Sequence, residues 1–300
     1  MKPAPFVHHA PRSVEEAAAT LAQVGHDGKV LAGGQSLIPI LNMRLASPAH
    51  LVDINQVAGL AEVTLTPEAV RVGALVRHAR LEHHPEAYAA LPLLRQALTH
   101  VAHPVIRNRG TTVGSIAHAD AAGEMPAVLA LTGGVVEAVS TAGTRDIDAT
   151  DFFLGALETS LAEDELVVAV RFPRFATGTG TAFLERARRH GDYAMAGVAA
   201  AVQVVDGAVR DARLSFVSVT DVPRVVDVTD QVRGHEADGL DWRAVAPTVR
   251  DQIEPEGDIH ATAEYRAMLA IELARLALDE ATAKSVAAQY DSAAERGIAR

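Results

Sequence analysis

The sequence contains no cysteine, and this absence excludes whole classes of redox and metal centre from the chain itself. Iron–sulfur clusters and many zinc sites are held by cysteine thiolates, so neither kind of site is expected here. No run of apolar residues approaches the roughly 18 that a membrane-spanning helix needs. Residues 1–5 (MKPAP) also lack the apolar core of a signal peptide. We therefore expect a chain without a membrane span, located in the cytoplasm.

Positive charge is scarce as well, because 27 lysines and arginines stand against 38 aspartates and glutamates. The net charge of −11 disfavours a nucleic-acid partner, which requires a basic surface. Two histidines that are adjacent in sequence, such as His83 and His84, cannot both face one metal ion from a helix or a strand. Serine-hydrolase, zinc-protease and Walker A motifs are missing. The sequence predicts neither a metal site nor a catalytic side chain.

What the sequence does contain is enough apolar surface for two domains. Its 300 residues, 49% of them hydrophobic, are long for a single core. Helix and strand patterns alternate every ~15 residues as far as about residue 172, which is typical of a mixed α+β domain. Residues 173–181 are rich in proline, glycine and threonine and form the best linker candidate. A hairpin about Asp206 and Gly207 and helices near 241–253 and 262–278 are predicted beyond it.

Residues 29–39 read as the end of a strand, a glycine turn and the start of a helix. Val30 and Leu31 are apolar, Gly33 and Gly34 make the turn, and Ser36 is an N-cap candidate before a new apolar run. Such a turn presents backbone N–H groups at a helix start, and the missing Cβ atoms let a phosphate approach closely. An ordinary strand-to-helix turn accounts for the same pattern equally well.

A second cluster of glycine and hydroxyl residues spans 106–120. It is too polar for a core strand and too rich in small residues for a helix, so we expect a loop. Thr111, Gly114 and Ser115 offer N–H groups and hydroxyls that suit a pyrophosphate, although a tight connection with hydroxyl-capped turns is the alternative. Glu124, just beyond, opens another helix and either accepts a hydrogen bond from a sugar hydroxyl or caps that helix.

Taken together, three stretches resemble the FAD-binding medium subunits of the molybdenum hydroxylases, the superfamily of xanthine dehydrogenase and carbon monoxide dehydrogenase. These stretches are residues 32–37 (AGGQSL), 106–120 and 188–194 (RRHGDYA). The resemblance covers nearly the whole chain. It implies an α+β fold, with a two-lobed FAD-binding domain of the vanillyl-alcohol-oxidase type over residues 1–176. A smaller C-terminal sheet-and-helix domain over 177–285 and a polar tail over 286–300 would follow.

The resemblance also implies a cofactor site. In that family the two glycine loops enclose the FAD pyrophosphate, the acidic position matching Glu124 holds the ribose, and positions matching Leu166 and Tyr193 lie near the flavin ring. Val113 stands where the family usually has a glycine, so either the backbone there is extended or FAD is held differently. The residues assigned to FAD are Ala32, Gly33, Gly34, Gln35, Ser36, Leu37, Val101, Thr111, Gly114, Ser115, His118, Asp120, Glu124, Leu166 and Tyr193.

By the same resemblance the chain is one subunit of a larger oxidoreductase. A small subunit with two 2Fe-2S clusters would pass electrons to FAD here, and a large subunit with the molybdenum cofactor would hydroxylate the substrate, in a dimer of heterotrimers. Residues 42–45 (NMRL) favour relatives acting on nicotine-, caffeine- or purine-like heterocycles. The alternatives are a carbon monoxide or aldehyde dehydrogenase medium subunit, a stand-alone FAD reductase of the same fold, and a non-catalytic nucleotide-binding protein.

Overall fold

The computed structural model describes the backbone of residues 2–298 and the side chains of residues 2–290. The chain forms two compact units, each assembled from separate stretches of sequence. Unit 1 comprises Met1–Ala90, His103–Asp120 and Gly133–Pro173, and unit 2 comprises Leu91–Ala102, Ala121–Thr132 and Arg174–Arg300. Within the described backbone, no helix has both the length and the apolar character needed to cross a bilayer.

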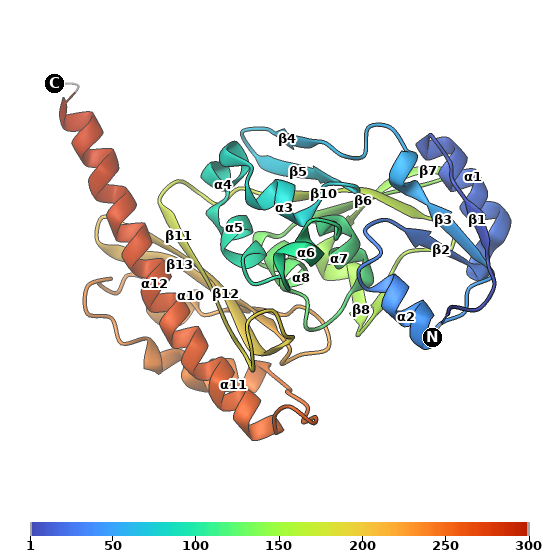
Figure 1. The fold of residues 1–300 in the computed structure, drawn as a ribbon. Coiled ribbons are helices and arrows are strands. Elements are labelled where there is room, and N and C mark those ends of the chain that lie inside the picture. Colours follow the sequence, from blue (N-terminus) through green and yellow to red (C-terminus); the bar gives the residue numbers. More distant parts are fainter. Residues whose placement is uncertain (1, 299–300) are drawn as a thin grey trace. The chain divides into compact units, whose positions relative to one another are not determined.

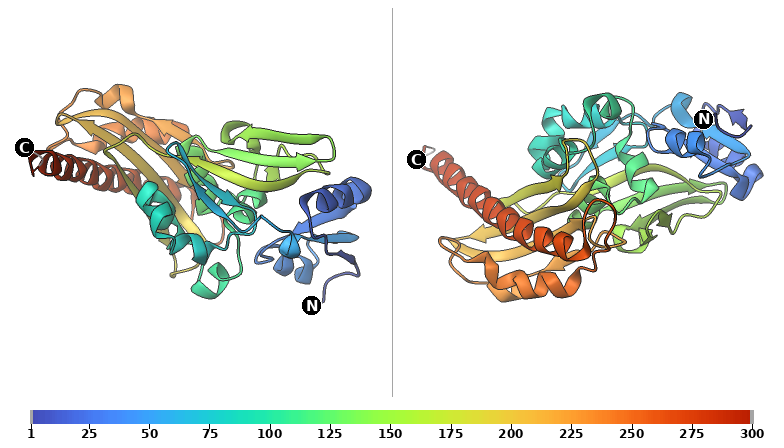
Figure 2. Two further views of the ribbon diagram at one scale, coloured as in Figure 1. Left: turned by 90° about the horizontal axis from the view of Figure 1, so that it is seen from above. Right: turned by 60° about the horizontal axis from the view of Figure 1, so that its bottom comes forward.

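Unit 1 begins with a small parallel sheet in the order β1-β3-β2, made of β1 (Val7–His9), β2 (Gly28–Leu31) and β3 (His50–Asp53). Helix α1 (Val14–Val24) packs against β3 (Figure 2). Ser13 caps its start, because the Ser13 hydroxyl accepts a hydrogen bond from the Glu16 N–H at 3.2 Å. After β2 the chain turns through the two glycines into α2 (Leu37–Met43), which confirms the predicted strand, turn and helix.

A five-stranded antiparallel sheet forms the second part of unit 1 (Figure 1). It consists of two hairpins, β4-β5 and β6-β7, with one further strand between them. The order is β4-β5-β10-β6-β7, with β4 (Val63–Leu65), β5 (Ala69–Gly73), β6 (Val135–Ser140), β7 (Gly143–Asp148) and β10 (Leu166–Pro173). Strand β7 lacks an apolar pattern because it is an edge strand with almost every residue exposed, so sequence reasoning missed it.

Short helices and one small hairpin complete unit 1. They are α3 (His78–Glu82), α4 (Pro85–Ala90), α6 (Pro104–Arg107), α7 (Thr112–His118), α9 (Ala149–Phe152), β8 (Phe153–Gly155) and β9 (Glu158–Thr159), with 3-10 turns at Gly25–Asp27 and Ile54–Gln56. The prediction of a loop over 106–120 was wrong, since α6 ends and α7 begins within it. Val113 and Ile116, three residues apart, are buried on one face of α7, but the small residues around them made this helical pattern hard to recognise.

Unit 2 is built on a four-stranded antiparallel sheet in the order β11-β12-β13-β14. Its strands are β11 (Thr179–Ala187), β12 (Ala194–Val205), β13 (Ala208–Val217) and β14 (Val225–Asp227). The predicted hairpin turn is confirmed, because Asp206 and Gly207 have φ values of 51° and 80°. Two positive φ values in succession are the signature of the type I′ turn, which matches the twist of the strands that it joins.

Helix α12 (Ala263–Ile298) runs across β11 and β12 (Figures 1 and 2). It continues well beyond the predicted end near Leu278, where the large apolar residues stop. Ala281 and Ser285 continue the buried face of the helix. They pack directly on β11 because Gly180 has no Cβ, for which there would be no space between strand and helix. The Ser285 hydroxyl also accepts from the Val204 N–H at 2.9 Å and donates to the Gly178 carbonyl at 2.6 Å.

The remaining helices of unit 2 pack around this sheet. They are α5 (Pro92–Leu98), α8 (Glu124–Thr132), α10 (Thr229–Val232), α11 (Ala246–Gln252) and a 3-10 turn at Trp242–Val245. Helix α8 is buried almost throughout and contacts β12 and β13, and α5 contacts α8 and β11. The core of unit 2 includes Trp242, Phe216 and Leu278, each at most 2% exposed.

Candidate functional site

The two glycine-containing segments that the sequence singled out lie directly against each other in unit 1. A Cβ added to Gly33 would lie 2.6 Å from the Arg109 carbonyl oxygen, 2.7 Å from Gly110 Cα and 3.0 Å from the Thr111 nitrogen. All of these are backbone atoms, which cannot move aside as a flexible side chain can. Glycine at position 33 is therefore required for the first segment to touch the second, and the two segments form one continuous backbone surface.

The first segment turns sharply between β2 and α2. Gly34 has a φ of 71°, in the left-handed region that glycine adopts most readily. The Gln35 side chain folds back and donates from Nε2 to the Gly33 carbonyl at 3.2 Å. Ser36 occupies the position before α2, as predicted, but its hydroxyl makes no capping hydrogen bond. Because the first N–H groups of a helix have no acceptor within the helix, this turn presents donors together with a hydroxyl.

The second segment is organised by Thr111, which caps α7. Its hydroxyl accepts from the Gly114 N–H at 3.1 Å, and a Cβ on Gly114 would lie 2.5 Å from that hydroxyl oxygen. Val113, the departure from the family pattern, lies in the first turn of α7 and is 2% exposed. Its backbone is thus helical rather than extended, and its side chain belongs to the core.

A buried ion pair and a neutral histidine lie next to the second segment. Arg107 and Glu82 form a buried ion pair, with the arginine Nε 2.8 Å from the carboxylate. Burial, and then the charge of Arg107, lower the pKa of the neighbouring His78 to about 4, so this imidazole is neutral at ordinary pH. His78 Nδ1 lies 3.3 Å from the Thr112 hydroxyl. The backbone of Gly110 lies close to the same ring, since a Cβ there would be 2.9 Å from its Cδ2.

The structure places the predicted site residues in both units. Residues 32–37, 111, 114 and 115 all belong to unit 1, where Gly33 lies against residues 109–111 and Gly114 lies against Thr111. His118 ends α7, Asp120 follows it, and Leu166 begins β10, all within unit 1. Val101, Glu124 and Tyr193 belong to unit 2, where Glu124 begins α8 and Tyr193 is 71% exposed just before β12.

Two further residues contact the site without having been predicted. Asn55 donates from Nδ2 to the Ala32 carbonyl at 2.8 Å, and the guanidinium of Arg77 donates to both Asn55 Oδ1 and the Arg109 carbonyl. Neither residue belongs to a recognisable motif, and their hydrogen bonds join residues far apart in the sequence. Only its place as a hydrophilic residue two positions after the strand at 50–53 could have indicated a role for Asn55.

The arrangement suits a diphosphate group, judged from the geometry alone. Two glycine turns that carry hydroxyl groups lie against each other, because the glycines let the two backbones approach closely. Among the residues that the structure describes, no group of three or more histidine, aspartate or glutamate side chains is placed to hold a metal ion.

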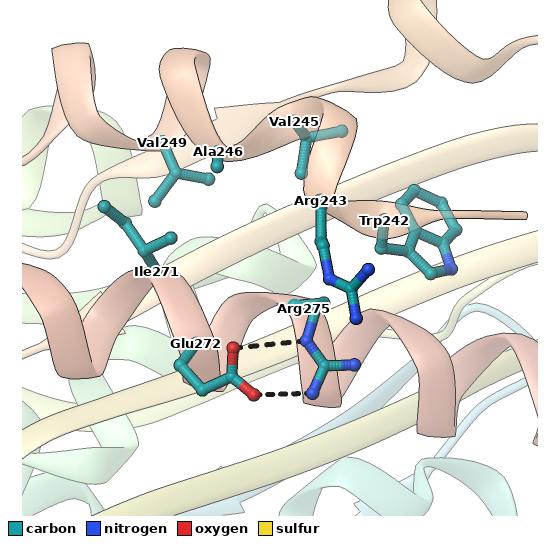
Figure 3. Close-up of a pocket in the computed structure, with 8 residues that line it drawn as sticks. All are labelled: Trp242, Arg243, Val245, Ala246, Val249, Ile271, Glu272 and Arg275. Atoms are coloured by element: carbon teal, nitrogen blue, oxygen red, sulfur yellow. Dashed lines mark hydrogen bonds and ion pairs between the residues drawn. The ribbon is translucent and has the colours of Figure 1, made fainter.

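A small hollow in unit 2 has a different character (Figure 3). Its volume is about 50 Å³, and it lies between α12 and the segment that begins at Trp242. Its charged groups are already engaged, because Arg275 pairs with Glu272 and Asp279, and Arg243 pairs with Asp241. A hollow of this size, with its carboxylate and guanidinium paired, offers no place for a cofactor.

Comparison with known proteins identifies the family. Residues 4–175 match the FAD binding domain in molybdopterin dehydrogenase, and residues 181–281 match the CO dehydrogenase flavoprotein C-terminal domain. The nicotine 6-hydroxylase medium subunit of Paenarthrobacter nicotinovorans is 40% identical, over 94% of this chain and 99% of its own length. Caffeine dehydrogenase subunit beta of Pseudomonas sp. (strain CBB1) is 38% identical over 90% and 92%.

The fold agrees with that of a solved relative. Carbon monoxide dehydrogenase from Hydrogenophaga pseudoflava, in a structure lacking the Mo-pyranopterin moiety, superposes with a TM-score of 0.90 at 35% identity over 95% of this chain and 99% of that one. The resemblance drawn from three short motifs is thereby confirmed, as is the mixed α+β architecture of an FAD-binding domain and a C-terminal domain. The chain belongs to the FAD-binding medium subunits of the molybdenum hydroxylase family.

Proposed function

We propose that this chain binds FAD on the surface formed by its two glycine segments, receives electrons from iron–sulfur clusters of a partner subunit, and passes them to an external acceptor. The observation that carries the proposal is the backbone contact between Gly33 and residues 109–111. A dinucleotide needs such an extended surface around its pyrophosphate, whereas a mononucleotide does not. Bound FAD supplies the redox chemistry, because a flavin exchanges electrons singly or in pairs.

The residues of this chain bind and orient the cofactor. N–H groups of the turn before α2 would donate to the pyrophosphate, and Ser36 and Ser115 would add hydroxyls. His118, Asp120 and Leu166 lie along the same unit and complete the proposed set there. The roles of Glu124 at the ribose and of Tyr193 beside the flavin, and the assignment of Val101 to the FAD site, remain predictions from the resemblance.

The source of the electrons must lie outside this chain. The sequence contains no cysteine, so it has no thiolate ligands for an iron–sulfur cluster. Relatives whose names describe a medium subunit and a subunit beta support a multi-subunit assembly. We propose a small subunit with two 2Fe-2S clusters and a large subunit with the molybdenum cofactor, arranged as a dimer of heterotrimers. The cytoplasmic location expected from the sequence stays a prediction.

The substrate class is proposed from the relatives, because the reaction at molybdenum would take place on another chain. Relatives named for nicotine and caffeine are 40% and 38% identical, against 35% for a carbon monoxide dehydrogenase. We therefore propose an N-heterocycle as the substrate hydroxylated by the complex. A carbon monoxide or aldehyde dehydrogenase complex is the alternative, and adding each substrate to the assembled complex distinguishes them by which one bleaches the flavin absorbance.

The direct test begins with the purified chain. It should be yellow, and heat or acid denaturation should release FAD rather than FMN into the supernatant, at one FAD per chain. A colourless chain that takes up no FAD would contradict the proposal, and a flavin that stays with the denatured protein would contradict noncovalent binding. Oxidation of a substrate by the chain alone would instead favour the stand-alone FAD reductase.

A further inference from the structure

We propose that Arg77 and Asn55 form a polar bridge that fixes the spacing between the two glycine segments, and that they are positioning residues for FAD. The inference rests on the proposed FAD function but assigns neither residue a contact with the cofactor. Both lie in unit 1, outside the motifs that carry the family resemblance. Their role would be to keep the two halves of the pyrophosphate surface in register.

Asn55 attaches the bridge to the first segment. It lies in the 3-10 turn at Ile54–Gln56 directly after β3, and its Nδ2 donates to the Ala32 carbonyl at 2.8 Å. Asp53 holds Asn55 in place, because its Oδ1 accepts from the backbone N–H at 2.9 Å and from Nδ2 at 2.6 Å. The amide oxygen of Asn55 is thereby turned towards Arg77, leaving little freedom for the side chain to rotate.

Arg77 attaches the bridge to the second segment. Its Nη2 donates to Asn55 Oδ1 at 2.7 Å, and its Nη1 donates to the Arg109 carbonyl. The backbone on either side of Arg77 is bonded to the same segment, with the His78 N–H donating to the Gly110 carbonyl at 3.0 Å and the Thr112 N–H donating to the Val76 carbonyl at 3.2 Å. The backbone around Arg77 is thus hydrogen-bonded to the second segment, and its side chain is linked to the first segment through Asn55.

The Arg109 carbonyl makes this bridge specific to the site. It is the acceptor for Arg77 and also the atom nearest to the missing Cβ of Gly33. One carbonyl therefore receives both the guanidinium and the closest approach of the first segment. A planar guanidinium can serve two acceptors in fixed directions, whereas a lysine ammonium is a single flexible donor group. We expect arginine to be needed at position 77 for its geometry rather than for its charge.

The test uses the full chain, stripped of flavin and titrated with FAD while flavin fluorescence is recorded. Arg77→Met should weaken FAD binding at least tenfold, Arg77→Lys should weaken it less, and Asn55→Leu should resemble Arg77→Met. Arg80→Met is the matched control, because Arg80 is an exposed arginine on the adjacent helix that donates to the Ala61 carbonyl, which belongs to neither segment. Its FAD affinity should equal that of the unmodified chain.

Two further measurements separate positioning from general stability. Thermal melting of the flavin-free variants should change no more for Arg77→Met than for Arg80→Met. The double variant Asn55→Leu/Arg77→Met should bind FAD about as weakly as either single variant, because both remove one bridge. Equal affinity in Arg77→Met and Arg80→Met, or additive losses in the double variant, would overturn the inference. Failure of the unmodified chain to bind FAD would instead overturn the proposed function.

Discussion

Replacing Gly33 by alanine tests whether the two glycine segments must touch. The added Cβ would lie 2.6 Å from the Arg109 carbonyl oxygen and 2.7 Å from Gly110 Cα. Ordinary contacts of a Cβ begin at about 3.4 Å, so the segments would have to separate by close to 1 Å. Overpacking of this kind costs about 1–3 kcal/mol. If this free-energy cost must be met each time the segments adopt the arrangement that binds FAD, the dissociation constant for FAD should rise about 5- to 150-fold. The conversion uses a factor of ten for each ~1.4 kcal/mol.

The assay is fluorescence titration of the flavin-free chain with FAD, beside Gly59→Ala as control. Gly59 has a φ of 79°, but a Cβ there would meet no atom within 4 Å. Its replacement should therefore cost about 1 kcal/mol of stability through backbone strain and leave FAD affinity unchanged. The same dissociation constant in Gly33→Ala as in the unmodified chain would refute the assignment of this contact to the cofactor surface.

Three other predictions concern side chains elsewhere. Burial, and then the charge of Glu124, raise the pKa of Glu185 to about 8 from 4.5, so the folded chain keeps a proton that the unfolded chain loses. The melting temperature should therefore fall as the pH rises from about 5 to about 8. Glu185→Gln should reduce that fall. Glu82→Leu leaves Arg107 buried without its carboxylate and should cost about 3–5 kcal/mol, measured by urea unfolding; an unchanged midpoint would contradict it. Tyr193→Ala should keep FAD bound but change its fluorescence or the kinetics of the acceptor, and identical spectra and kinetics would make Tyr193 structural.

Local sequence signals predicted those parts of the fold that depend on a few neighbouring residues. The strand, glycine turn and helix around Gly33 follow from backbone freedom and the position of Ser36. The hairpin at Asp206 and Gly207 follows from turn chemistry in the same way. Such features can be predicted without knowing which distant residues they contact, because the conformational preference of a turn is set within about four residues.

Features that depend on distant partners were missed or misjudged. Helix α7 looked like a loop because its helical character rests on the Thr111 cap and on burial of Val113 against the rest of unit 1. The second half of α12 has few large apolar residues, and its contact surface exists because Gly180 lies on the facing strand. The links from Asn55 and Arg77 to main-chain carbonyls could not be inferred, since any residue supplies a carbonyl.

The measurement that tests the central claim most directly is reduction of the flavin within the assembled complex. A tagged copy of the chain, expressed with its genomic neighbours, should co-purify with an iron–sulfur subunit and a molybdenum subunit, and it should contain one FAD. Adding substrate without an acceptor should reduce the clusters and bleach the flavin absorbance, whereas the isolated yellow chain should show no bleaching. If the tagged chain emerged alone and its own flavin were reduced by substrate, the account of this chain as an electron-transfer subunit would be contradicted.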